Sequence, residues 1–256
     1  MTETLDEPDE RHQTIELPQF RLPHGVERSF RPLGVADEVT LLSDGVRLRT
    51  GSTTVEVTAL ASGVFRVGVF ADGRPVDFAS EAVHEANRPP APAPARVERR
   101  GEEVVVHTEA ARARVLVAPV RVAFEDAAGA PFGEDEPALG AGHMVLPPDV
   151  RVPEPFGPPA RLYKRRRGGE RYFGCGERTG GLDKTGSRQV FWNSDPPAQH
   201  TESLNNLYTS IPFVLALDAD AHAHGAWGLF VDNAGRVAID LARRHAGRVS
   251  ASLDCG

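Results

Sequence analysis

The stretch Val120-Arg121-Val122-Ala123-Phe124-Glu125-Asp126-Ala127-Ala128-Gly129-Ala130-Pro131-Phe132 predicts a β-hairpin. Its first five residues alternate between large apolar and polar or small side chains, which places Val120, Val122 and Phe124 on one face of a strand. The four residues from Asp126 to Gly129 have the composition of a tight turn. The chain then returns at Pro131-Phe132 as a second strand.

Similar short β-type runs recur on both sides of this hairpin, between glycine and proline residues. They cover residues 55–60, 64–70, 104–107, 112–117, 171–173, 189–192, 213–217, 226–231, 237–241 and 249–253. Many short strands separated by turn signals favour an all-β fold, a sandwich of antiparallel sheets. Only residues 78–86 suggest one or two helical turns.

The pattern divides the chain into two parts. Residues 1–36 form an acidic, largely irregular N-terminal arm, and residues 37–256 form the β-sandwich. Proline-rich segments at 89–94 and 147–159 are expected to be surface loops, and the second separates an earlier group of strands from a later one. The chain stops directly after the β-type run at 249–253, which we interpret as a cut and not a natural end.

Composition excludes several classes of protein. The 256 residues carry a net charge of −7, so a nucleic-acid partner is not expected. The start is acidic and no apolar run is long enough to span a membrane, which predicts a cytoplasmic protein with no membrane contact. Cys175 and Cys255 form neither a disulfide framework nor a metal-ligand spacing.

Two glycine-rich patterns fail as nucleotide sites. Gly174-Cys175-Gly176 is followed at the next required position by Thr179, which breaks the dinucleotide fingerprint. Lys184-Thr185 follows Asp183, where a phosphate-binding loop requires glycine. His222-Ala223-His224 alternates like a pair of metal ligands, but the sequence shows no third ligand. We therefore expect neither a cofactor nor a metal.

Three segments carry a more specific signal. They are Tyr172-Phe173-Gly174-Cys175-Gly176-Glu177-Arg178, then Phe191-Trp192-Asn193-Ser194-Asp195-Pro196-Pro197, then Leu207-Tyr208-Thr209-Ser210-Ile211-Pro212-Phe213. In this order they resemble the N-terminal, galactose mutarotase-like domain of family-31 glycoside hydrolases of the α-glucosidase and α-xylosidase type. Gly228-Leu229-Phe230-Val231-Asp232-Asn233 continues the resemblance, which covers residues 40–256.

The resemblance implies a β-supersandwich that precedes a catalytic (β/α)8 barrel. The parent enzyme would hydrolyse α-linked oligosaccharides or glycosides from the non-reducing end with retention, which needs two carboxylic side chains. In the family both are aspartates of the barrel, which this chain lacks, so we expect no catalytic residue here and no activity of the chain alone. The missing barrel is then its partner in the same polypeptide.

Asp195 is the one substrate-binding residue that the resemblance implies, because the family's loop reaches the wall of the sugar pocket. A carboxylate there accepts hydrogen bonds from sugar hydroxyls. The alternative is that Asp195 only caps a turn before Pro196. The bound sugar is left open by the sequence.

Other polar and aromatic residues favour structural roles. Phe191 and Trp192 point to opposite faces of a strand, and core packing is favoured over sugar stacking for each. Glu177 and Arg178 are expected to form an ion pair at a sheet edge. The four cations at 164–167 are expected to lie in a solvated loop.

Two other functions stay open. One is a stand-alone carbohydrate-binding β-sandwich. The other is a sugar epimerase of the mutarotase type, for which His200 and Glu202 are the expected acid–base pair.

Overall fold

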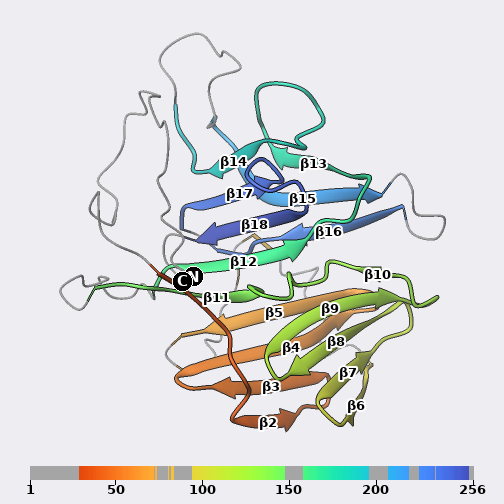
Figure 1. Cartoon of the computed structure of the whole chain (residues 1–256). Coiled ribbons are helices and arrows are strands. Elements are labelled where there is room, and N and C mark those ends of the chain that lie inside the picture. Colours follow the sequence, from red (N-terminus) through yellow and green to blue (C-terminus); the bar gives the residue numbers. More distant parts are fainter. Residues whose placement is uncertain are drawn as a thin grey trace. The chain divides into compact units, whose positions relative to one another are not determined.

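A computed structural model describes residues 29–71, 73, 80, 82–83, 94–147, 158–195, 207–218, 225–233 and 235–253. Within these residues all helical or strand structure consists of β-strands (Figure 1). The strands pair in antiparallel register, as the hairpin and its neighbours show. The predicted all-β antiparallel fold is therefore confirmed.

The chain divides into two compact units. The N-terminal unit contains residues 32–142, and the C-terminal unit contains residues 29–31 and the described residues from 143 onward. This division falls shortly before the proline-rich segment at 147–159, where the sequence predicted a break between two groups of strands. Residues 148–157 of that segment lie outside the described residues.

Two sheets build the N-terminal unit. In spatial order they contain β2 (Glu38–Leu41), β3 (Gly45–Thr50), β4 (Thr53–Ala61) and β5 (Val64–Phe70), and then β10 (Pro131–Phe132), β9 (Val120–Asp126), β8 (Ala111–Val117), β7 (Glu103–His107) and β6 (Arg96–Arg100). The period-2 pattern forms the core, since cross-strand partners such as Leu48 and Val55 are both fully buried. Phe65 of β5 packs 5.5 Å from Phe124 of β9, measured between ring centroids.

The predicted hairpin is confirmed. Phe132 of β10 lies opposite Phe124 of β9, and their rings stack at 5.7 Å. The Asp126 side chain accepts a 2.8 Å hydrogen bond from the Ala130 amide. Gly129 supplies the positive φ of 88° that closes the turn.

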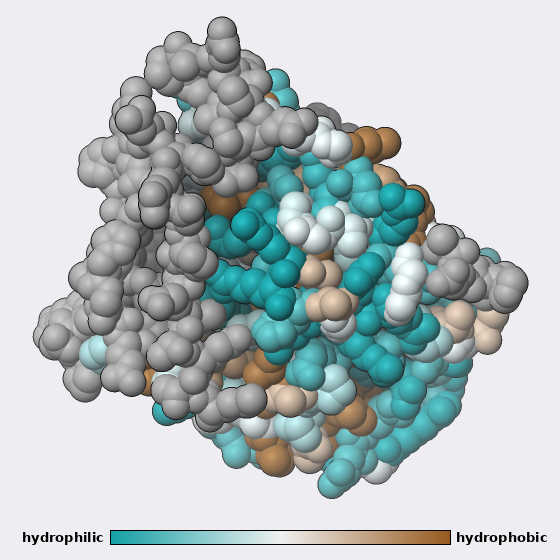
Figure 2. Space-filling model, turned by 45° about the horizontal axis from the view of Figure 1, so that its top comes forward, coloured by the Kyte–Doolittle hydropathy of each residue, from teal (hydrophilic) through white to brown (hydrophobic). Residues whose placement is uncertain are grey.

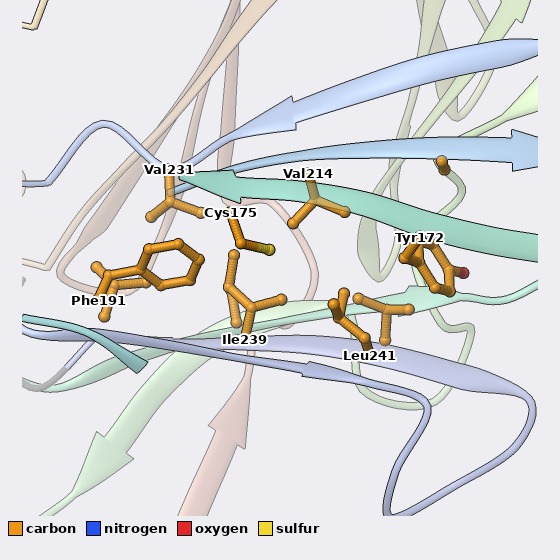
Figure 3. Close-up of a cluster of buried hydrophobic side chains, with 11 residues drawn as sticks. Tyr172, Cys175, Phe191, Val214, Val231, Ile239 and Leu241 are labelled. Atoms are coloured by element: carbon orange, nitrogen blue, oxygen red, sulfur yellow. The ribbon is translucent and has the colours of Figure 1, made fainter. Parts of the chain in front are cut away.

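A second pair of sheets builds the C-terminal unit. In spatial order they contain β1 (Ser29–Pro32), β11 (Ala141–Val145), β12 (Ala160–Arg165), β18 (Arg248–Leu253), β17 (Val237–Leu241) and β14 (Arg188–Phe191), and then β13 (Glu170–Gly176), β15 (Ser210–Asp218) and β16 (Ala226–Phe230). Their facing side chains form one hydrophobic cluster (Figure 3). Ile239 and Leu241 of β17 lie in it against Val214 of β15. This cluster fixes how β13, β14 and β15 are placed relative to one another.

One loop prediction is wrong. The cations at 164–167 begin inside β12, where Lys164 pairs with Val249 of β18 and is only 5% exposed. The main chain of Lys164 is bonded within the sheet, and the aliphatic part of its side chain is buried. The prediction counted only the charges of this run, and charge alone does not show that a lysine side chain can be buried in this way. Regular structure also begins at β1, ahead of Asp37, because Phe30 packs edge-on against Tyr163 at 5.1 Å.

Several expected loops cannot be compared with the structure. Most of the stretch at 78–86 and of the proline-rich segment at 89–94 lies outside the described residues.

On the face of the molecule shown in Figure 2, hydrophilic residues cover most of the described surface, and hydrophobic residues form separate smaller patches. Leu182, at 80% exposure, is the most exposed of the large apolar residues that the structure describes.

Candidate functional site

The three segments singled out in the sequence meet in the C-terminal unit. The amide of Glu177, just after β13, donates to the carbonyl of Thr209, just before β15, at 3.3 Å. The amide of Ser194, after β14, donates to the carbonyl of Leu207 at 3.0 Å. Segments far apart in the chain are thereby held side by side.

A shift in the register between β13 and β15 shapes the first segment. Gly174, Cys175 and Gly176 all have positive φ, at 97°, 72° and 74°. The register passes from Gly174 opposite Val214 to Gly176 opposite Ser210, so three residues of β15 face only Cys175. A Cβ on Gly174 would lie 2.8 Å from the carbonyl oxygen of Phe213, which explains why glycine stands there.

Cys175 has a structural role. Its side chain is fully buried in the hydrophobic cluster (Figure 3). Burial raises the pKa of the Cys175 thiol to about 11, although the nearby cations Arg178 and Lys184 act in the opposite direction. The thiol therefore stays protonated at neutral pH and is a poor nucleophile.

Arg178 joins the three segments. Its guanidinium carbon lies 4.8 Å from the centroid of the Phe191 ring, and Nη2 donates to Ser210 Oγ at 3.2 Å. Nη1 donates at 3.3 Å to the main-chain carbonyl of Glu177, where the sequence predicted an ion pair with the carboxylate. Burial lowers the pKa of Arg178, yet an arginine so far above neutrality stays charged.

The aromatic pair behaves partly as predicted. Phe191 is 3% exposed and belongs to the hydrophobic cluster, which confirms its predicted place in the core. β14 ends at Phe191, so Trp192 follows the strand and is half-buried. An indole that is neither in the core nor fully solvated is able to contact a ligand.

Asp195 lies at the end of this described segment and is exposed. It follows Ser194, whose amide donates to the carbonyl of Leu207. Residues 196–206 lie outside the described residues, and with them the predicted pair His200 and Glu202. Contact of Asp195 with a ligand therefore stays a prediction.

A salt bridge ties the next loop to β13. The guanidinium of Arg171 donates to Asp183 Oδ2 at 2.6 and 2.8 Å, and the Thr185 amide donates to Asp183 Oδ1 at 2.9 Å. Burial acts to raise the pKa of Asp183, but the bonds from Thr185 and Arg171 outweigh it and lower that pKa to about 2. Asp183 is therefore ionised at neutral pH.

Sequence reasoning missed a buried carboxylate. Glu170 is 2% exposed and accepts hydrogen bonds from Tyr172 Oη at 2.8 Å, from Trp227 Nε1 at 3.0 Å and from the Arg167 amide at 3.1 Å. Burial, and then the nearby charge of Glu170, raise the pKa of the Tyr172 hydroxyl. The signal that could have found it is an acidic residue at the first position of a β-type run.

The described residues contain neither a metal-binding cluster nor a membrane-spanning helix. Among the described residues, no group of three or more His, Cys, Asp or Glu side chains is placed to hold a metal ion, and His222 and His224 lie outside them. Where the structure is described, no helix is long and apolar enough to cross a membrane.

The family model described as "Glycosyl hydrolase 31 N-terminal galactose mutarotase-like domain" matches residues 54–240 of this chain. This range contains all three converging segments. It also spans strands of both units.

Known proteins are similar over a part of their length. Alpha-glucosidase 2 of Bacillus thermoamyloliquefaciens is 35% identical over 72 residues, which are 28% of this chain and 9% of the relative. The GH31 dextranase of Flavobacterium johnsoniae has a TM-score of 0.72 at 24% identity, over 88% of this chain and 26% of its own. A glucosidase II alpha subunit has a TM-score of 0.64 at 18% identity, over 90% of this chain and 31% of that subunit. The likeness to these two structures shows that this chain shares the fold of the matching part of each.

Proposed function

The chain belongs to the family of glycosyl hydrolase 31 N-terminal galactose mutarotase-like domains, and we propose that it supports a retaining α-glycosidase and shapes its sugar pocket. Two findings support this proposal: the matching family model describes an N-terminal domain of glycosyl hydrolase family 31, and the relative at 35% identity is an alpha-glucosidase. The dextranase has been solved with glucose and with isomaltotriose, so an α-linked glucoside or a related sugar is the substrate class that we propose.

One observation carries the proposal. Arg178, Phe191 and Ser210 draw three separate segments together, and the chain that leaves this junction presents half-buried Trp192 and exposed Asp195. A carboxylate and an indole three positions apart suit a sugar, because the carboxylate accepts bonds from hydroxyls while the ring covers C–H groups. The main-chain bond at Ser194 limits the conformational entropy that ligand binding would remove.

Glu170 and Asp183, two acidic residues whose partners the structure shows, do not suit the hydrolytic step. Both oxygens of Glu170 are occupied by Tyr172, Trp227 and a main-chain amide inside the core. Asp183 is paired with Arg171 and is too acidic to donate a proton at neutral pH. Retention requires a carboxylate nucleophile and a carboxylic acid about 5–5.5 Å apart. We therefore assign both to a catalytic barrel in the same polypeptide, with Asp195 acting on sugar recognition.

Hydrolysis of 4-nitrophenyl α-D-glucoside tests this assignment. The 256-residue chain is expected to show no turnover above buffer, and the polypeptide that also contains the barrel is expected to show turnover. Pocket walls without reacting groups leave nearly all of the activation barrier in place. Saturable hydrolysis by the chain alone, unchanged when Asp195 is replaced by Asn, would contradict the proposal.

A further inference from the structure

The outward face of the sheet formed by β13, β15 and β16 is apolar. Successive side chains of a strand point to opposite faces of its sheet. Tyr172 and Val214 point into the hydrophobic cluster (Figure 3), and Trp227 packs against it, so their neighbours point away from it. These outward residues are Phe173 of β13, Phe213, Leu215 and Leu217 of β15, and Gly228 and Phe230 of β16.

The apolar groups of this face lie side by side. Phe213 of β15 is opposite Phe230 of β16, and the two residues are 39% and 38% exposed. The Phe213 ring also covers Gly228, because a Cβ at that glycine would lie 2.7 Å from Phe213 Cε2. Leu215 lies between Gly228 and Phe173, its partners on the two neighbouring strands. The face is therefore one continuous apolar surface.

The other sheet of the C-terminal unit has a polar outward face. One row across β12, β18 and β17 contains Tyr163, Ser250 and Asp240, and Arg161 and Ser252 lie in the next row. The neighbours of these residues on β18 belong to the hydrophobic cluster. An antiparallel sheet with one face in water carries polar side chains on that face, as this sheet does. The apolar outward face of β13, β15 and β16 instead indicates a surface that a partner covers.

The size of this face favours a partner within the same polypeptide. Five paired residues along three strands make a face of roughly 240 Å², at about 3.4 Å per residue and about 4.8 Å between strands. A stable dimer buries about 800 Å² on each partner, so this face alone would hold a second copy of the chain only weakly. A domain joined to the chain needs less area, because the connection gives it a roughly millimolar effective concentration.

The similar proteins have the sequence that such a partner needs. The chain spans 26% of the dextranase and 31% of the glucosidase II alpha subunit, and the matching family model describes an N-terminal domain. Most of the length of these two proteins therefore lies outside the part that this chain matches.

We propose that the outward face of β13, β15 and β16 is the surface on which the catalytic barrel of the same polypeptide packs. The identity of this partner rests on the function proposed above. The outer ring of a (β/α)8 barrel consists of helices, and a helix packs on a sheet through an apolar stripe. β15 contributes Phe213 to this face and Ser210 to the junction at Arg178, so the same packing holds the junction against the barrel.

The rate of cysteine labelling by iodoacetamide tests the inference. Phe230→Cys is introduced into the 256-residue chain and into the polypeptide that also contains the barrel, and peptide mass mapping separates the new thiol from Cys175 and Cys255. Labelling is expected to be at least about tenfold slower in the longer polypeptide, because a covered thiol is inaccessible. Ile211→Cys, two positions before Phe213 and at a residue that is 47% exposed, is expected to be slowed in the same way, so the test does not depend on the folding of one variant.

Leu116→Cys is the matched control. Leu116 of β8 belongs to the N-terminal unit and is 42% exposed, close to the exposure of Phe230. Its labelling rate is expected to agree within about twofold between the two proteins.

Equally fast labelling of both proteins at positions 211 and 230 would overturn the inference, and so would an equal slowing at position 116. Labelling in the 256-residue chain that slows as its concentration rises would assign the face to a second copy instead. The readout does not require hydrolysis. Turnover of 4-nitrophenyl α-D-glucoside without slowed labelling contradicts the inference alone, and slowed labelling without turnover contradicts the proposed function alone.

Discussion

The two units differ in the partners of their buried and half-buried carboxylates. On β6 to β9 of the N-terminal unit three glutamates contact basic side chains: Arg114 bonds Glu103 at 2.7 Å and Glu125 at 2.8 Å, and His107 bonds Glu98 at 2.7 Å. The bonds from Glu125 and Glu103 raise the pKa of Arg114. The C-terminal unit instead buries Glu170, whose carboxylate accepts hydrogen bonds from Tyr172, Trp227 and a main-chain amide. Charges matched across strands stabilise the register of a sheet, whereas a buried carboxylate depends on the neutral donors around it.

Removal of one carboxylate from each unit is expected to give the largest contrast. Glu170→Ala leaves the Tyr172 hydroxyl and the Trp227 indole buried without their acceptor, and is expected to lower the free energy of unfolding by about 3–5 kcal/mol. Glu125→Ala is expected to lower it by about 1 kcal/mol or less, since Arg112 and Arg114 are exposed enough to be hydrated. Urea unfolding of both variants measures the difference.

Glu170→Gln is the control for the larger effect, because an amide oxygen still accepts one of the three bonds. It is expected to fall between wild type and Glu170→Ala. Equal losses for the alanine variants of the two units would contradict the contrast.

Two glycine substitutions, one in each unit, compare how strongly a close main-chain contact affects the free energy of unfolding. Gly174→Ala combines a positive φ of 97° with a Cβ only 2.8 Å from a main-chain oxygen, and is expected to lower the free energy of unfolding by at least about 3 kcal/mol. Gly101 also has positive φ, at 63°, but a Cβ there meets nothing within 4 Å. Gly101→Ala is expected to lower the same free energy by about 1 kcal/mol. Thermal unfolding would rank the two, and the reverse order would refute the role of the close approach.

Two histidines, one in each unit, predict how the free energy of unfolding depends on pH. His107 bonds Glu98, whereas both ring nitrogens of His143 are buried with no hydrogen-bond partner among the described residues. Burial lowers the pKa of His143 below its ordinary value of 6.5. The unfolded chain then takes up the proton first, so the free energy of unfolding is expected to fall as pH drops below about 6.5.

Replacement of this ring by an aromatic without nitrogen isolates its effect. His143→Phe is expected to show a smaller decrease in the free energy of unfolding between pH 7 and pH 5, measured by urea unfolding at each pH. An unchanged decrease would assign the pH dependence to other groups.

Much of the fold could be predicted because it rests on local patterns. β5 and β17 have the predicted bounds, and the hairpin at Phe124 is closed by the predicted turn. β6 and β12 were missed because charged residues make up four of the five positions of β6 and three of the six positions of β12. In β6, Glu98 bonds Arg96, Arg100 and His107, and such partners are known only once the strands are paired.

The candidate site could be predicted only in part. The order of the three segments in the sequence indicated the family and Asp195. It did not indicate that Arg178 contacts all three segments, because its partner Ser210 lies 32 positions away in the chain. The bond between Trp227 and Glu170 spans 57 positions, so no window of sequence contains both.

We propose that the junction at Arg178 presents Asp195 to a sugar. The most direct test is the catalytic efficiency of Asp195→Asn toward a natural α-linked disaccharide, in the polypeptide that contains the barrel. The substitution is nearly isosteric and is expected to leave the melting temperature unchanged while weakening recognition by about 1–3 kcal/mol. Glu109→Gln, which removes an exposed carboxylate from the N-terminal unit, is expected to match wild type. Unchanged efficiency with a lowered melting temperature would show that Asp195 only caps a turn, and would contradict the account.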